Sequence, residues 1–135
     1  MSEVPANLQY ARTHEWVRRE DDGRVVIGIT DYAQQSLGDI TFVQLPPPGA
    51  RINAGAMFGV IESVKAAADI YSPVPGLVEA VNRQLINHPP VINSAPYGDG
   101  WLVRFTQSEA TLSLISAEEY RSLVAEAPPP RTTTG

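Results

Sequence analysis

Short apolar segments separated by turn-forming residues run through most of this sequence and limit the folds that it can adopt. The turn signals are Asp21-Asp22-Gly23, Pro46-Pro47-Pro48-Gly49 and Ser72-Pro73-Val74-Pro75-Gly76. They separate segments with strand character, which we expect over residues 15–20, 24–29, 39–45, 57–61, 69–71, 77–81 and 101–105. Strands do not alternate with long helices, as a parallel sheet would require. The pattern therefore predicts a small antiparallel sandwich or barrel.

Two helices are expected beside the strands. Thr30 is a suitable N-cap for a short helix over residues 31–37, and Gly38 can end that helix with a left-handed backbone. Ser116 and Glu119 have the spacing of a capping box, which predicts a C-terminal helix that reaches about residue 125.

The length of 135 residues fits one domain, which we place at residues 1–126. Residues 1–6 are interpreted as a loose end. The segment 87–100 is rich in Pro, Asn and Gly and is interpreted as an ordered loop, because Trp101 resumes the apolar pattern. The Pro- and Thr-rich tail over residues 127–135 is expected to be disordered.

Composition excludes several classes of function. The net charge of -5 and the lack of a basic stripe argue against a nucleic-acid partner. No apolar run approaches the length of a membrane span, and the N-terminal residues lack a basic region followed by an apolar one, so we expect no membrane association and a bacterial cytoplasmic location. With no cysteine and two histidines, the chain has no disulfide, no cysteine nucleophile and no His-rich metal site.

Lys65 is the only lysine in the chain, whereas nine arginines supply the other positive charges. It lies between two expected strands, where a turn would present its side chain. A single primary amine on a turn is suited to selective acylation, and arginine cannot replace it because the guanidinium is a poor nucleophile. An ordinary solvated surface lysine explains the position equally well.

Residues 62–73 around this lysine resemble the lipoyl-attachment segment of the glycine cleavage system H-protein family. Further blocks resemble the same family in the same order: Tyr10-Ala11-Arg12-Thr13-His14-Glu15-Trp16, Gly28-Ile29-Thr30-Asp31-Tyr32-Ala33-Gln34, Leu37-Gly38-Asp39-Ile40, Pro96-Tyr97-Gly98-Asp99-Gly100-Trp101 and Ala117-Glu118-Glu119-Tyr120. Together they cover roughly residues 8 to 125. The resemblance implies a mostly-β, barrel-sandwich hybrid fold like that of lipoyl and biotinyl domains, with a short internal helix and a C-terminal helix. Residues 1–126 would then be a lipoyl-carrier domain.

Proteins of this family are carriers rather than enzymes, and the resemblance implies the same for this chain. Lipoate would be attached to Lys65 as an amide by lipoate-attaching enzymes. The pyridoxal-phosphate-dependent glycine decarboxylase (P protein) would load an aminomethyl group. The tetrahydrofolate-dependent aminomethyltransferase (T protein) would take its methylene, and dihydrolipoyl dehydrogenase (L protein, with FAD and NAD) would reoxidise the dithiol. We expect the carrier to be a monomer.

The resemblance also implies roles for five other residues. Thr13, Glu15 and Asp69 match positions that line a surface cleft in which the loaded arm is sheltered, where a carboxylate pair suits a cationic amine. Glu62 and Gly49 match positions that guide the attaching enzyme. Without the resemblance, Glu15 and Glu62 would be interpreted as solvated strand residues, Asp69 as a turn residue and Gly49 as a glycine needed for its turn conformation.

Other functions are weighed against this one. An H-like protein that relays lipoate to other complexes has the same sequence features. A biotinyl carrier is disfavoured because Val64 and Ala66, rather than methionines, flank Lys65. An imine-forming lysine enzyme would need a pocket and an acid–base partner, and the sequence offers neither near the turn. The family often has Ser or Thr where this chain has Ala67 and Ala68, so hydroxyl contacts there are missing.

Overall fold

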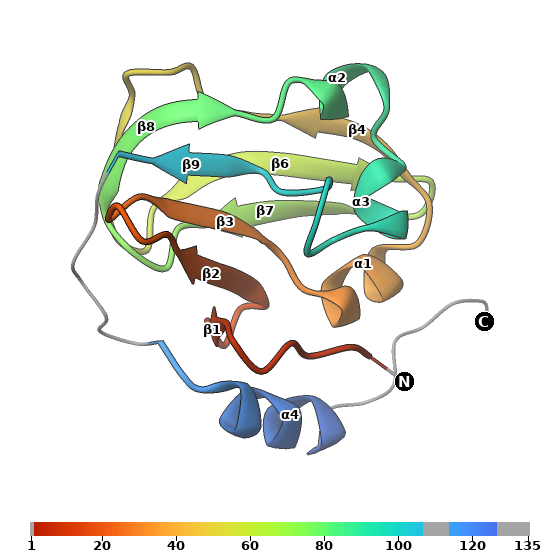
Figure 1. Ribbon diagram of the computed structural model, residues 1–135. Helices are drawn as coiled ribbons and strands as arrows, with labels where there is room; N and C mark the ends of the chain where they lie inside the picture. The colour runs from red at the N-terminus through yellow and green to blue at the C-terminus, as the bar shows by residue number, and fades with distance from the viewer. Residues whose placement is uncertain (1, 107–113, 127–135) are drawn as a thin grey trace.

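The computed structural model describes residues 2–106 and 114–126 and contains two antiparallel sheets (Figure 1). The larger sheet has the order β1-β2-β3-β9-β8-β5, formed in turn by Gln9–Tyr10, Glu15–Arg19, Val25–Ile29, Val103–Phe105, Gly76–Val81 and Arg51–Ile52. The smaller sheet has the order β4-β6-β7, formed by Ile40–Gln44, Met57–Ser63 and Ala67–Tyr71. No pairing among the described strands joins the two sheets. The predicted mostly-β hybrid fold is therefore confirmed, as a sandwich rather than a closed barrel.

The main apolar core contains side chains from both sheets. All five residues of β3 are buried, and Ile61 and Ile70 from the smaller sheet join the same cluster as Val78 and Phe105 from the larger one. Burying each such side chain contributes about 1.5–3 kcal/mol to the stability of the fold, so the packing of this cluster is the main interaction that holds the two sheets together. The core thereby fixes β2, β3 and β7 relative to one another, and these strands carry the site described below.

The short internal helix α1 (Asp31–Leu37) begins and ends where the sequence predicts. The Ala33 N–H donates to the Thr30 hydroxyl over 3.2 Å, which satisfies one of the free amides at the helix start. Gly38 follows the helix with a φ of 78°, a conformation that glycine adopts at little cost.

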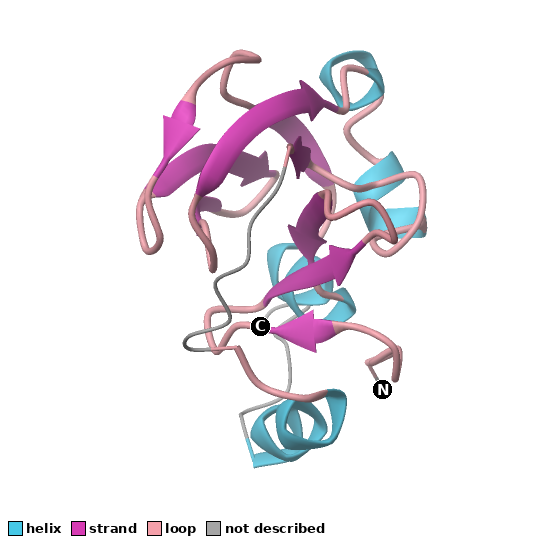
Figure 2. Ribbon diagram, turned by 60° about the vertical axis from the view of Figure 1, so that its left-hand side comes forward, coloured by secondary structure: helices cyan, strands magenta, loops and turns pink. Residues whose placement is uncertain are grey.

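The C-terminal helix α4 (Ala117–Glu126) begins at the predicted capping box. The Ser116 N–H donates to the Glu119 carboxylate and the Glu119 N–H donates to the Ser116 hydroxyl, each over 3.1 Å. Both views place α4 beside β1, apart from the main core (Figures 1 and 2). Here the fully buried Tyr120 stacks on Tyr10 with ring centroids 4.6 Å apart, in a second apolar cluster that includes the buried Trp16.

Residues 87–100 differ from the expected loop, because they contain the short helix α3 (Val91–Ser94) and the end of α2 (Gln84–Asn87). The Pro, Asn and Gly residues suggested a loop, but Pro90 immediately precedes α3, a position where a missing N–H costs nothing. The Asn93 side chain accepts from the Ile40 N–H over 3.0 Å and donates to the Gly38 carbonyl over 2.8 Å. It therefore joins this segment to the end of α1.

The N-terminal residues are also more ordered than a loose end. The Glu3 N–H donates to the Asp31 carboxylate over 2.9 Å, the Tyr97 hydroxyl donates to the Glu3 carbonyl over 2.6 Å, and Arg121 donates to the Val4 carbonyl over 2.9 Å. These partners are distant in the sequence, which is why local composition did not reveal them. The predicted disordered tail, 127–135, lies outside the described residues. Within the described part of the chain, no helix has the length and apolar character needed to cross a membrane.

Candidate functional site

Lys65 lies at the tip of the β6–β7 hairpin, as the sequence predicts. The Ser63 N–H donates to the Ala66 carbonyl over 2.7 Å, and the Ala66 N–H donates to the Ser63 hydroxyl over 3.0 Å. The Val64 N–H donates to the Asp39 carbonyl over 3.0 Å and ties the turn to the neighbouring chain. These three hydrogen bonds hold the base of the turn. Val64 is 78% exposed and Lys65 is exposed, so the turn presents the lysine to an approaching protein.

An open cavity of about 220 Å³, which we call the cleft, lies close to this hairpin. Its walls come from the segment that leads into β2, from β3, from α1 and from β7: Thr13, His14, Glu15, Ile29, Tyr32, Ala33, Ser36, Leu37, Ala68, Asp69 and Ile70. A Cβ placed on Gly38 would lie 3.5 Å from Lys65 Cε, so the lysine stem passes the end of α1, the helix that forms one wall. The structure thus brings Thr13, Glu15 and Asp69 together in one cleft, near the lysine.

Glu15 is the buried acid of the cleft. The residue is only 2% exposed, although its place in the sequence alone would be interpreted as that of a solvated strand residue. Burial raises the pKa of Glu15 from 4.5 to about 7, and this effect outweighs the hydrogen bonds from the Thr13 hydroxyl and the Tyr71 N–H that favour the charged form. Glu15 can therefore be neutral or charged near neutral pH, depending on what lies beside it.

Thr13 and Asp69 are exposed residues at the rim of the cleft. Thr13 is occupied as a donor, since its hydroxyl donates to one Glu15 oxygen. Asp69 lies on β7 and adds a second carboxylate to the lining. A cation that enters the cleft would therefore meet two carboxylates, whereas Ile29, Leu37 and Ile70 offer apolar contacts.

Residues adjacent to Lys65 in the sequence offer no pocket or acid–base group, but the structure places the cleft and Glu15 close to the lysine turn. Glu15 is brought there by a strand 50 positions earlier in the sequence, which spacing along the chain does not reveal. Lys65 itself is not among the residues that line the cleft.

Glu62 and Gly49, the two positions matched to recognition by the attaching enzyme, lie outside the cleft. Glu62 is exposed on β6, opposite Ala67 and close to the turn. Gly49 lies in the connection from β4 to β5, at the other end of β6 from the turn (Figure 1). Its φ of 91° requires glycine, and its N–H donates to the Val78 carbonyl over 2.8 Å. A recognition role for either residue stays a prediction.

Sequence reasoning missed how His14, Tyr32 and Tyr120 are connected to the cleft. His14 has a φ of 78°, the only positive value for a residue other than glycine in the described chain. Its ring packs against Tyr32 at 4.8 Å, and its Nδ1 lies 2.7 Å from the Tyr120 hydroxyl. Burial lowers the pKa of His14, so its ring is neutral at neutral pH. The family blocks included all three residues, but nothing in the spacing predicted their contacts.

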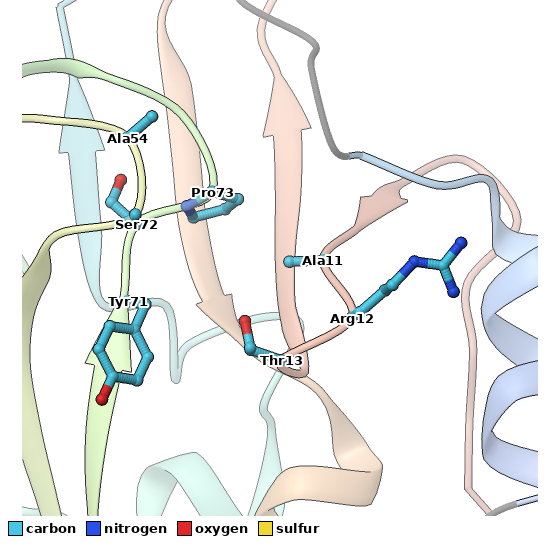
Figure 3. Close-up of a pocket in the computed structure, with 8 residues that line it drawn as sticks. Ala11, Arg12, Thr13, Ala54, Tyr71, Ser72 and Pro73 are labelled. Atoms are coloured by element: carbon cyan, nitrogen blue, oxygen red, sulfur yellow. The ribbon is translucent and has the colours of Figure 1, made fainter.

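A second, larger hollow of about 740 Å³ shares Thr13 with the cleft (Figure 3). Its walls come from three separate turns and strand ends: Ala11, Arg12, Thr13, Ala54, Gly55, Tyr71, Ser72 and Pro73. Figure 3 shows Thr13 and Tyr71 on facing sides, while the Arg12 side chain extends away. Arg12 is the only charged residue in this lining, whereas the cleft is lined by two carboxylates, Glu15 and Asp69. Among the described residues, no group of His, Cys, Asp and Glu side chains could hold a metal ion.

Comparison with known proteins identifies the family. The family model for the glycine cleavage H-protein matches residues 8–127. The chain belongs to the glycine cleavage H-protein family. The glycine cleavage system H protein of Opitutus terrae is 52% identical over 126 residues, which are 92% of this chain and 99% of the relative. That of Mycolicibacterium vanbaalenii is 51% identical over 131 residues, 93% of this chain and 100% of the relative.

A solved structure agrees with the fold of this H-protein family member. The crystal structure of a glycine cleavage system H protein from Mycobacterium marinum matches with a TM-score of 0.83 and 37% sequence identity. The match covers 88% of this chain and 97% of that protein. The family resemblance noted in the sequence is thereby confirmed, along with the lipoyl-domain-like sandwich.

Proposed function

We propose that this chain is the lipoyl carrier of a glycine cleavage system, with lipoate joined to Lys65 by an amide bond. The observation that carries the proposal is the position of Lys65 at an exposed hairpin tip beside a cleft that contains Thr13, Glu15 and Asp69. When bound, lipoate supplies a dithiolane that can accept the aminomethyl group of glycine and two electrons. The chain itself holds and presents the group, as a non-catalytic component.

The cleft suits such a group in its chemistry. Ile29, Leu37 and Ile70 offer apolar surface to an alkyl chain and to sulfur. Glu15 and Asp69 offer carboxylate oxygens to a protonated primary amine, which forms charge-assisted hydrogen bonds with them. An apolar wall next to two carboxylates matches an arm that is apolar along its length and cationic at its loaded end.

Glu15 is the residue that we assign to holding the amine. A cation beside a carboxylate favours its ionised form and lowers its pKa from the value of about 7 that burial sets. Amine binding and ionisation of Glu15 therefore support each other. Because Thr13 and the Tyr71 N–H each donate to a Glu15 oxygen, the carboxylate is already oriented before the amine arrives. Shielding the amine here would slow the loss of the labile aminomethyl group to water.

The partners follow from the same proposal. The P, T and L proteins would each receive the arm in turn, and a lipoate-attaching enzyme would recognise the hairpin, Glu62 beside it and the Gly49 turn. Tethering the cargo to one small protein gives it a high effective concentration at each docked enzyme. We further propose that the carrier acts as a monomer in the bacterial cytoplasm, and the bacterial origin of the relatives named above supports a bacterial source.

Attachment can be tested by intact mass after co-expression with a lipoate-attaching enzyme. The parent chain should gain the mass of one lipoyl group, and Lys65→Arg, which keeps the charge, should gain none. Glu118→Gln alters an exposed acid on α4, away from the hairpin, and should gain it like the parent. No gain in the parent, or a gain that persists in Lys65→Arg, would refute the assignment of Lys65.

Glycine cleavage and lipoate relay are separated by a second experiment. The lipoylated chain, mixed with a cognate glycine decarboxylase, should support exchange of labelled bicarbonate into the carboxyl group of glycine. Lys65→Arg is the matched control and should support none. Lipoylation without exchange would favour the relay of lipoate to other complexes instead.

A further inference from the structure

The hydroxyl of Tyr120 contacts His14, which lines the cleft, and Thr30, which caps the helix that forms another of its walls. Neither Tyr120 nor Thr30 lines the cleft itself. This residue lies on α4, beyond β1 and outside the main core (Figure 2). Its oxygen lies 2.7 Å from His14 Nδ1 and 2.7 Å from the Thr30 hydroxyl. His14 belongs to the segment that leads into β2, and Thr30 immediately precedes α1, so a single side chain contacts the starts of two elements that form walls of the cleft.

The first connection acts on the wall that contains Glu15. His14 stands between Thr13 and Glu15, and its φ of 78° costs about 1–2 kcal/mol for a residue with a side chain. The His14 N–H donates to the Ala11 carbonyl over 3.0 Å, and its carbonyl accepts from the Thr30 N–H over 3.0 Å. The Tyr120 contact holds the ring of the same residue. This backbone conformation sets the directions in which Thr13 and Glu15 leave the turn.

The second connection acts on the wall formed by α1. Thr30 is fully buried, and its hydroxyl caps α1 by accepting from the Ala33 N–H. Tyr32, Ala33, Ser36 and Leu37 of this helix line the cleft. A partner that fixes the Thr30 hydroxyl therefore fixes the start of the helix, and with it the distance between the helical wall and Glu15.

Tyr120 is held rigidly enough for this role. Its ring is fully buried and stacks on Tyr10 with an interplanar angle of 11°. Its N–H donates to the Ser116 carbonyl over 2.9 Å, next to the capping box. We propose that Tyr120 is a positioning residue, which holds His14 and the start of α1 in the arrangement of the cleft that shelters the loaded amine. This inference rests on the proposed function of the cleft, and it gives α4, which carries Tyr120, a part in that function.

The test compares two tyrosines of the same stack. Tyr120→Phe removes the hydroxyl and keeps the ring, whereas Tyr10→Phe removes a hydroxyl that donates to the Pro5 carbonyl over 2.5 Å and does not line the cleft. Each lipoylated protein is loaded with glycine and the cognate decarboxylase, the enzyme is removed, and the release of ammonium is followed. Tyr120→Phe should release ammonium about two- to tenfold faster, the effect of one lost neutral hydrogen bond. Tyr10→Phe should match the parent, and lipoylation should be the same in all three.

A spectroscopic measurement reports the contact directly. The ring ¹⁵N shifts of His14 should change in Tyr120→Phe and stay unchanged in Tyr10→Phe, and the exposed His88 serves as an internal reference. If Tyr120→Phe does not fold, His14→Asn removes the same contact from the other side, because Asn tolerates a positive φ. Release from His14→Asn at the parental rate would then overturn the proposal.

Glu15→Ala separates failure of this inference from failure of the proposed function. If Glu15→Ala releases ammonium at the parental rate, the cleft does not shelter the amine and the proposed function of the cleft fails. If Glu15→Ala releases it faster while Tyr120→Phe and Tyr10→Phe both match the parent, the cleft functions without Tyr120. The positioning role is then refuted.

Discussion

The Tyr71 N–H donates to Oε2 of Glu15 over 3.3 Å and joins two residues that are 56 positions apart. Tyr71 ends β7 in the smaller sheet, and Glu15 begins β2 in the larger one. The buried acid of the cleft is therefore attached to the strand that starts just after the Lys65 turn. Because the Thr13 hydroxyl occupies the other oxygen, the carboxylate is held between the two sheets. Its protonation state then affects both stability and the proposed binding of an amine.

Glu15→Gln should make the protein more stable at pH 8. Since the pKa of Glu15 rises from 4.5 unfolded to about 7 folded, the folded state binds more protons between these values. The contribution of Glu15 to the free energy of unfolding is therefore greatest below pH 4.5, falls as the pH rises to about 7 and is constant above pH 7. A shift of this size corresponds to about 3 kcal/mol at most. Glutamine carries no charge, its carbonyl oxygen can accept from the Tyr71 N–H, and its amide can donate to the Thr13 hydroxyl.

Chemical denaturation of both proteins from pH 4.5 to 8 measures this difference. The difference in the free energy of unfolding between Glu15→Gln and the parent should be near zero at pH 4.5 and should grow as the pH rises to about 7. The contribution of His14, whose lowered pKa reduces stability as pH falls, is common to both proteins and cancels. A difference that is independent of pH would show that Glu15 does not titrate in this range.

Thr13→Val should raise the pKa of Glu15 further above 7. The Thr13 hydroxyl donates to the charged carboxylate and is the largest of the effects that lower this pKa. Valine has nearly the same shape and cannot donate. Titration of the Glu15 side-chain carbon by NMR measures the change. Thr41→Val is the matched control, because Thr41 is exposed on β4 and its hydroxyl contacts the Glu62 carbonyl instead. An equal pKa in both variants would contradict the assigned bond.

Local patterns in the sequence predicted those parts of the fold that local physics decides. The Thr30 cap, the Gly38 stop and the Ser116–Glu119 capping box each involve residues within one or two helical turns, and all three are confirmed. Lys65 at a hairpin tip followed from its place between two strands.

Contacts between distant segments could not be predicted in the same way. The burial of Glu15 depends on β7, and the Tyr120 contact with His14 spans 106 positions. The two-residue strands β1 and β5 are too short to show a period of two. The family resemblance supplied Thr13, Glu15 and Asp69 as a group, whereas the raised pKa and the connection to α4 required the structure.

Gly49→Ala separates a recognition role for Gly49 from its conformational role. Gly49 and Gly55 have φ values of 91° and 82°, and a Cβ at either position would meet no atom within 4 Å. Alanine at either site should therefore cost about 1–2 kcal/mol through backbone strain alone. We expect the rate of lipoate attachment to fall in Gly49→Ala and not in Gly55→Ala. Equal rates at equal stability would remove Gly49 from the recognition surface.

Gly28→Ala should both destabilise the protein and disturb the cleft. A Cβ on Gly28 would lie 2.6 Å from the indole of Trp16, which is fully buried and whose Nε1 donates to the Pro96 carbonyl over 3.0 Å. The ring has no room to move without breaking that bond, so we expect a loss of about 1–3 kcal/mol from overpacking.

Overpacking at Gly28 should push β2 and β3 apart, and this displacement should reach Glu15. Trp16 pairs with Gly28, and the next pair along the strands is Glu15 with Ile29, both of which line the cleft. Denaturation should show the loss of stability, and NMR titration should show a changed pKa of Glu15. Gly98→Ala is the control: its nearest neighbour is the Ala95 Cβ at 3.9 Å, so both quantities should stay at their parental values. A stable Gly28→Ala with a parental Glu15 pKa would mean that β2 and β3 can separate slightly here without moving the cleft wall.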